Sequence, residues 1–199
     1  YVSFDDGDHW QSLMLNLPNT AYRDLQIHGN ELIVGTYGRG LWILDDYSAL
    51  REVTASTLAE SAHLYTPGEA IRVRRNVNLD TPMAPDVPAA LNPPLGAVIY
   101  YSLGANPKTP IQLDVFDAAG KLVRHMSSEP IAPYDDPPTA VPSFWKEVRK
   151  PLPTAIGLNR VNWNIRHDTP PAFVHDEQDV MGARPGDTPQ SIEGPLALP

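Results

Sequence analysis

The sequence predicts an all-β protein, and three observations point to this class. Short runs of strand-forming residues alternate with turns rich in Gly, Asp and Asn over residues 1–46 and again over 96–168. Within these runs apolar and polar residues alternate, which is the period of a half-buried strand. The 22 prolines are concentrated in 82–94, 130–153 and 170–199. Because proline interrupts helices and sheets, we expect long loops there.

Composition excludes several classes of function. The chain has 15 Lys and Arg against 24 Asp and Glu, a net charge of −9, so it lacks the basic surface that a nucleic-acid partner requires. No apolar run approaches the roughly 18 residues that span a bilayer, and no signal peptide is visible. Cysteine is absent, which excludes disulfides, thiol chemistry and thiolate zinc sites. A bound metal would therefore need His and carboxylate ligands.

The first element is a hairpin turn within "SFDDGDHW", residues 3–10. Ser3, Asp5, Gly7 and Trp10 fit the pattern S-x-D-x-G-x-x-W. Gly7 supplies a positive φ, and the Asp5 carboxylate can accept hydrogen bonds from the backbone of the turn. The Ser3 hydroxyl can form a hydrogen bond within the turn, and the ring of Trp10 can pack beneath it. The flanking residues "YVSF" and "WQSLML" have the composition of strands.

A cation site is the alternative interpretation of this turn. Asp6, Asp8 and His9 could bind an ion, but their spacing does not match an EF-hand loop. We therefore interpret the turn as structural.

This turn pattern resembles the Asp-box of the BNR-repeat β-propellers, which include sialidases and the sortilin ectodomain. A second stretch, residues 24–46, is similar to the closing blade of large bacterial BNR-repeat proteins through "VGTYGRG" at 34–40 and "WILDD" at 42–46. The resemblance implies that residues 1–56 form a terminal propeller blade. It also implies a structural Asp-box, because in that family the box lies on the outer rim, away from the central pocket.

The residues of this region support strands independently of the resemblance. Leu25 and Ile27 alternate with polar neighbours, and "ELIVGTY" is rich in β-formers. Gly38 and Gly40 predict a tight turn, and "LWIL" after it predicts a buried strand. "DYSALREV" predicts a short helix with Asp46 or Ser48 as its N-cap. Trp10, Trp42 and Trp163 lie in strand patterns, so we expect them in the core.

Residues 57–95 are expected to hold an exit strand, "AIRVRR", and then a Pro-rich linker. Order is expected to return at 96, with a strand "GAVIYYSLG", a hairpin "PIQLDVFDAAGKLVRHMSS" and a strand "GLNRVNWNIRHD". Residues 113–124 and 157–168 resemble the FlgD-type immunoglobulin-like domain. This resemblance implies a β-sandwich over 96–199 that lacks its last strand, because the sequence stops at "GPLALP".

One blade without its neighbours would expose strand edges that pair readily with other chains. We therefore expect a homo-oligomer formed through exposed strand edges. No second Asp-box is present in the sequence.

Three functions remain open. The first is a non-catalytic structural or binding module of a secreted or periplasmic BNR-repeat protein. The second is a metal-dependent hydrolase of esters or phosphoesters, with zinc as the candidate metal. Its ligands would be His167, Asp168, His175 and Asp176, and the site could lie at an oligomer interface. The third is glycan binding through Trp145. Sialidase catalysis is not expected, because its residues come from several blades, and no G-x-S-x-G elbow or phosphate loop occurs.

Overall fold

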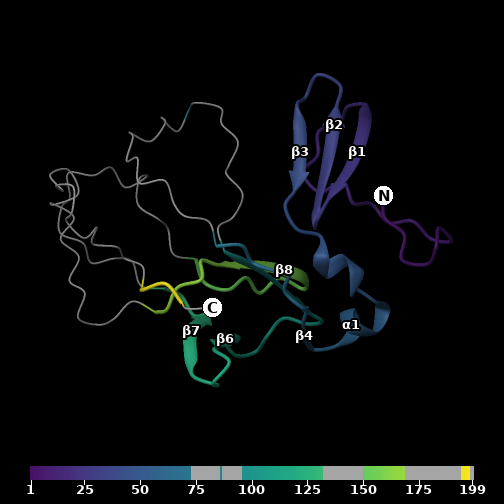
Figure 1. Cartoon of the computed structure of the whole chain (residues 1–199). Coiled ribbons are helices and arrows are strands. Elements are labelled where there is room, and N and C mark those ends of the chain that lie inside the picture. The colour runs from purple at the N-terminus through teal and green to yellow at the C-terminus, as the bar shows by residue number, and fades with distance from the viewer. Residues whose placement is uncertain (73–85, 87–95, 132–149, 169–193, 198–199) are drawn as a thin grey trace, which may run out of the picture. The chain divides into compact units, whose positions relative to one another are not determined.

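A computed structural model describes residues 1–72, 86, 96–131, 150–168 and 194–197 of the chain (Figure 1). In these residues strands predominate and helix is scarce, so the predicted all-β class is confirmed. The backbone contacts divide the chain into two compact units. The first comprises Tyr1–Ala70, Ala97–Ala105 and Ala155–Asn162, and the second comprises Ile71–Gly96, Asn106–Thr154 and Trp163–Pro199.

The first unit contains an antiparallel three-stranded sheet, visible in Figure 1. Its strands are β1 (Tyr22–His28), β2 (Glu31–Thr36) and β3 (Leu41–Leu44), in the order β1-β2-β3. The predicted glycine turn joins β2 to β3, with φ of 74° at Gly38 and 73° at Gly40. Glycine tolerates this left-handed conformation, so the chain reverses within a few residues.

This sheet has apolar side chains on both faces. Directly paired residues of antiparallel strands lie on the same face. The register therefore gives one face Leu25, Ile27, Leu32, Val34, Trp42 and Leu44. The other face is mixed, with Ile33, Leu41 and Ile43 beside the polar residues Asp24, Gln26, His28 and Glu31. The predicted burial of "LWIL" is wrong, because Leu41 is 75% and Ile43 is 54% exposed; a four-residue apolar run predicts a strand but not what covers it.

The N-terminal hairpin is short. Val2 and Gln11 exchange two backbone hydrogen bonds of 2.9 Å, and this bridge is the only β pairing in residues 1–21. Trp10 is 62% exposed, so its predicted place in the core is wrong. The indole caps the turn locally, and local contacts of this kind do not require burial.

Two short helical turns connect the first sheet to the next strand. They are η1 (Ser48–Arg51), a 3₁₀ turn, and α1 (Ala55–Ala59). The predicted short helix is thus present, but the residue at its N-cap is Tyr47, which makes no side-chain capping bond. Asp46 nevertheless holds the entry to the turn, because its carboxylate accepts the Ser48 N–H at 2.8 Å.

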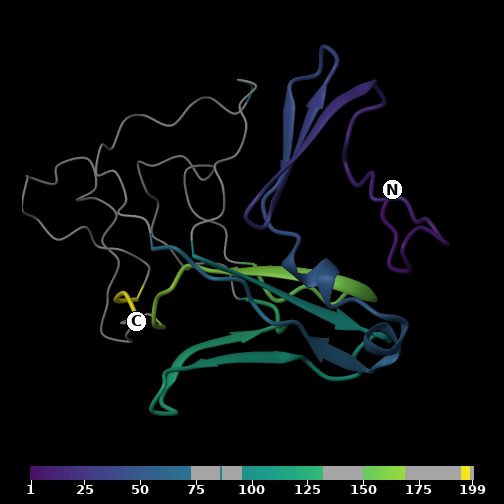
Figure 2. The same ribbon diagram turned by 45° about the vertical axis from the view of Figure 1, so that its right-hand side comes forward.

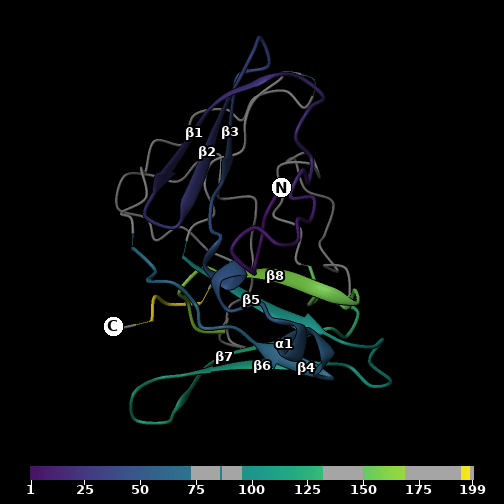
Figure 3. The same cartoon turned by 90° about the vertical axis from the view of Figure 1, so that its right-hand side faces the viewer.

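The second sheet has the order β4-β5-β8, with β4 (Ala62–Leu64), β5 (Ala97–Leu103) and β8 (Gly157–Trp163). Figure 2 shows the central strand β5 running between its two partners. β5 is buried along most of its length. Its Tyr100 forms a core cluster with Ala49 and Tyr65, against which Val53 and Val98 pack. The connecting turns therefore supply one side of this core, and Figure 3 shows α1 beside β5.

The second unit contains the predicted hairpin of β6 (Gln112–Phe116) and β7 (Leu122–Ser127). Asp117 closes its turn, since its Oδ1 accepts the N–H groups of Ala119 and Lys121 at 2.9 Å each. After β8 the chain continues through Ile165, which has a φ of 56°, to an isolated bridge between Arg166 and Leu196.

The predicted exit strand is only partly described. Ile71 and Arg72 lie in no strand, and residues 73–75 lie outside the described residues, as does most of the predicted linker. Instead, the short strand β4 follows α1 and pairs with β5. Among the helices in the described part of the chain, none is both long and apolar enough to span a membrane.

Candidate functional site

The turn at residues 3–10 brings together the four residues of the S-x-D-x-G-x-x-W pattern. The Ser3 hydroxyl accepts the Gly7 N–H at 2.8 Å and donates to Asp5 Oδ1 at 2.9 Å. The same carboxylate oxygen accepts the His9 N–H at 2.8 Å. Trp10 donates its indole N–H to the Gly7 carbonyl at 2.9 Å. Each of these polar side chains therefore binds the turn itself.

Gly7 has a φ of 102°, a conformation that other residues rarely adopt. A Cβ added at this position would lie 3.7 Å from Cζ2 of Trp10, which is an ordinary contact. The glycine is thus required by its backbone conformation and not by lack of space.

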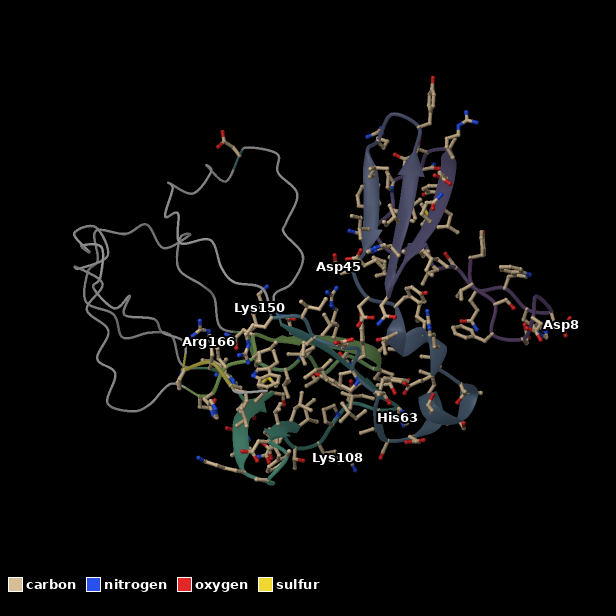
Figure 4. The ribbon with its side chains drawn as sticks, viewed as in Figure 1. Asp8, Asp45, His63, Lys108, Lys150 and Arg166 are labelled. Carbon is tan, nitrogen blue, oxygen red and sulfur yellow. The ribbon has the colours of Figure 1, made fainter. Side chains whose placement is uncertain are left out.

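The electrostatics of this turn favour an ionised Asp5. The His9 backbone N–H lowers the pKa of Asp5 below its usual 3.8, and the His9 ring and the Ser3 hydroxyl lower it further. The His9 Nδ1 lies 2.5 Å from Asp5 Oδ2, so the second carboxylate oxygen is also occupied. Figure 4 labels Asp8 on this turn. With both oxygens of Asp5 engaged within the turn, the carboxylate has little capacity left for a metal ion.

The histidines of the described residues do not converge. His9, His28, His63 and His125 each face one carboxylate, on Asp5, Glu31, Glu60 and Asp114 respectively. Within the part of the chain that the structure describes, no group of three or more His, Asp or Glu side chains could hold a metal ion.

Of the four predicted zinc ligands, His167 and Asp168 lie in the described part of the chain. Asp168 Oδ2 accepts the His125 backbone N–H at 3.1 Å, and its Oδ1 lies 3.3 Å from Nη1 of Arg124. His167 contributes its backbone carbonyl, which accepts a 3.2 Å bond from the same Arg124. The other two predicted ligands, His175 and Asp176, lie outside the described residues, as does Trp145. Asp168 thus has an ion-pair role, and the zinc hypothesis stays a prediction.

Sequence reasoning missed the pair formed by Asp114 and His125. The register of the β6–β7 hairpin places the two residues directly opposite each other, and His125 Nδ1 lies 2.6 Å from Asp114 Oδ1. Counting back from the predicted "DAAG" turn would have revealed this cross-strand pair. A carboxylate beside an imidazole orients the ring, but the described residues place no hydroxyl nucleophile on that imidazole.

A second set of polar residues was also missed, at the end of β3. The Tyr100 hydroxyl donates to the Asp46 carbonyl at 2.7 Å, and Arg160 Nη2 lies 3.4 Å from Asp45 Oδ2. Asp45 is labelled in Figure 4. These bonds join residues that are far apart in sequence, so no local pattern predicts them. They fasten the first sheet to β5 and β8 within the first unit.

Comparisons with known proteins return no relative. No protein-family model, no curated protein and no solved structure matches this chain.

Proposed function

We propose that this chain is a non-catalytic structural and binding module, made of a terminal Asp-box propeller blade followed by an immunoglobulin-like sandwich. The observation that carries the proposal is the hydrogen bonding of the Asp-box turn. Ser3, Asp5 and Trp10 direct their polar atoms to the backbone of the turn, so they stabilise the fold and leave little for a substrate. Their chemistry is that of a structural turn.

The first sheet gives independent support to the blade. A sheet with apolar residues on both faces is expected to be covered on both sides, as a blade is covered by its neighbours. Leu25 and Ile27 are 63% and 67% exposed on one face, and Leu41 is 75% exposed on the other. The face of Leu41 also carries the polar residues Asp24, Gln26 and Glu31, so its apolar part is confined to Ile33 and β3.

The paired strands β5 and β8 and the β6–β7 hairpin supply strands of the kind that a sandwich over 96–199 needs. Immunoglobulin-like domains build their core from two antiparallel sheets. The described residues include one three-stranded sheet with a buried central strand and one separate hairpin. In this proposal the parent protein is extracytoplasmic, as BNR-repeat proteins with such sandwiches are.

The test measures metal content and hydrolysis on the same purified sample. We expect no stoichiometric zinc by elemental analysis, and no hydrolysis of ester or phosphotriester substrates with or without a chelator. Stoichiometric metal together with hydrolysis that the chelator abolishes would establish the hydrolase instead. In that case, His167→Ala and His175→Ala would show whether these histidines are ligands. Titration with sialosides and plant cell-wall oligosaccharides tests glycan binding, with Trp145→Ala as the matched variant.

A further inference from the structure

The two edges of the β1-β2-β3 sheet differ in how well they are protected. Edge strands expose unpaired N–H and C=O groups that can pair with another chain, and proteins guard them with bulges or polar side chains. β1 has both devices: the register shifts between Tyr22 and Asp24, and Asp24 Oδ1 accepts the Leu25 N–H at 2.9 Å. Among the described residues, nothing pairs with the outer edge of β3.

One backbone bond shows which groups of β3 face outward. The Thr36 N–H donates to the Gly40 carbonyl at 3.2 Å, so Thr36 bonds toward β3. Because bonding alternates along an antiparallel pair, Val34 and Leu32 also bond toward β3, at Trp42 and Leu44. The backbone groups of Leu41 and Ile43 therefore point away from β2.

We propose that the outer edge of β3 pairs with the same edge of a second copy, in one antiparallel register centred on Trp42. This interaction goes beyond the proposed function and does not rest on it. In this register Leu41 of each copy lies opposite Ile43 of the other, as a hydrogen-bonded pair. Trp42 lies opposite Trp42 as a non-hydrogen-bonded pair, the closer of the two arrangements, and aromatic cross-strand pairs of this kind are favourable.

Charge complementarity favours a second copy as the occupant. The exposed Arg39 lies in the turn just before β3 and Asp45 follows β3, so an antiparallel two-fold pairing brings the arginine of each copy to the end of β3 that carries the aspartate of the other. Asp45 uses Oδ2 for Arg160, which leaves Oδ1 to receive the incoming guanidinium. Trp42 holds the backbone of Arg39 in place by donating its indole N–H to the Arg39 carbonyl at 3.0 Å.

β3 itself carries no charged residue, so two copies can pair along it without placing like charges opposite each other, although the chain has a net charge of −9. A register centred on Ile43 would instead place the apolar Leu41 opposite the carboxylate of Asp45. The two registers are therefore distinguishable by which residues meet.

Disulfide trapping tests the register directly, because the chain has no cysteine of its own. Leu41→Cys and Ile43→Cys chains are prepared separately, then oxidised alone and as a mixture. Since paired strand residues fall within disulfide range, we expect a linked heterodimer from the mixture and little linkage in either chain alone. Leu25→Cys, on the edge of β1, is the matched control and should stay unlinked. Efficient self-linkage of Ile43→Cys or of Leu25→Cys would overturn the proposal.

Sedimentation of the unmodified chain completes the test. We expect a dimer that Ile43→Pro converts to a monomer, because proline removes an outward N–H and leaves the β2–β3 bonds intact. Ile27→Pro on β1 is the control and should remain dimeric; circular dichroism checks that both variants keep their strands. Arg39→Glu should weaken the dimer about tenfold. A wild-type chain that sediments as a monomer would refute the proposal. This holds even if hydrogen exchange shows that another segment of the same chain protects the Ile43 amide.

Discussion

The hydroxyl of Tyr100 donates a 2.7 Å hydrogen bond to the backbone carbonyl of Asp46, which precedes it by 54 residues. Tyr100 is in β5, and Asp46 follows the last strand of the first sheet. Both residues are buried, at 8% and 7% exposure. The bond therefore joins the two sheets of the first unit where water does not compete for it.

Removing this hydroxyl should destabilise the first unit. Tyr100→Phe leaves a buried carbonyl without its partner, which costs about 1–3 kcal/mol of unfolding free energy. Urea unfolding followed by circular dichroism measures the loss. Tyr22→Phe is the matched control, because the Tyr22 hydroxyl bonds to the Pro18 carbonyl at 2.6 Å at the exposed surface. Equal stability of Tyr100→Phe and wild type would show that the bond contributes nothing.

Gly104 should not tolerate a side chain. A Cβ at this position would lie 2.4 Å from the Glu60 carbonyl oxygen, and backbone oxygen cannot move aside cheaply. Gly104→Ala should therefore lower the unfolding free energy by about 1–3 kcal/mol, the usual cost of overpacking. Gly29→Ala is the control: it has open space around its Cβ and only the cost of its φ of 59°. We expect the control to lose less stability in the same urea titration.

The turn at residues 3–10 should weaken in acid. The pKa of Asp5 is lowered below 3.8, chiefly by the His9 backbone N–H. A depressed pKa means that folding favours the ionised carboxylate, so its contribution is complete above pH 3.8 and is lost as the pH falls below that value. An NMR titration of the Asp5 carboxyl carbon measures the pKa. A midpoint at or above 3.8 would contradict the geometry described for this turn.

Ionisation of the Tyr101 phenol should destabilise the fold in strong alkali. Burial raises its pKa to about 12 from the usual 10.0. A raised pKa means that folding favours the protonated phenol, so this contribution is complete below pH 10 and declines as the pH rises toward 12. Ultraviolet titration of wild type and Tyr101→Phe isolates this group. Ionisation of Tyr101 near pH 10 in the folded chain would show that the side chain is not buried as described.

Local sequence patterns were sufficient for the turns and for the longer strands. Gly7, Gly38 and Gly40 occupy left-handed conformations in the turns predicted for them, and Asp117 closes the β6–β7 hairpin. These features depend on the conformational freedom of glycine and on short-range bonds of Asp, which neighbouring residues reveal.

Features that depend on distant contacts could not be predicted. The exposure of Trp10 and Ile43 depends on what packs against them, which an alternating pattern does not show. β4 has three residues and is defined by its pairing with β5, so it gave no signal of its own. The pairs of Tyr100 with Asp46 and of Arg160 with Asp45 join residues that only the folded chain brings together.

The side chains of Ser3, Asp5 and Trp10 hold their own turn, and we expect them to bind no ligand. Hydrogen exchange of the His9 amide, with and without a metal chelator, tests it most directly, because this amide donates to Asp5 at 2.8 Å. The structure predicts slow exchange that the chelator does not change, and fast exchange in Asp5→Ala. Exchange in the wild type that the chelator accelerates to the rate of Asp5→Ala would show that a bound metal orders the turn, contradicting this claim.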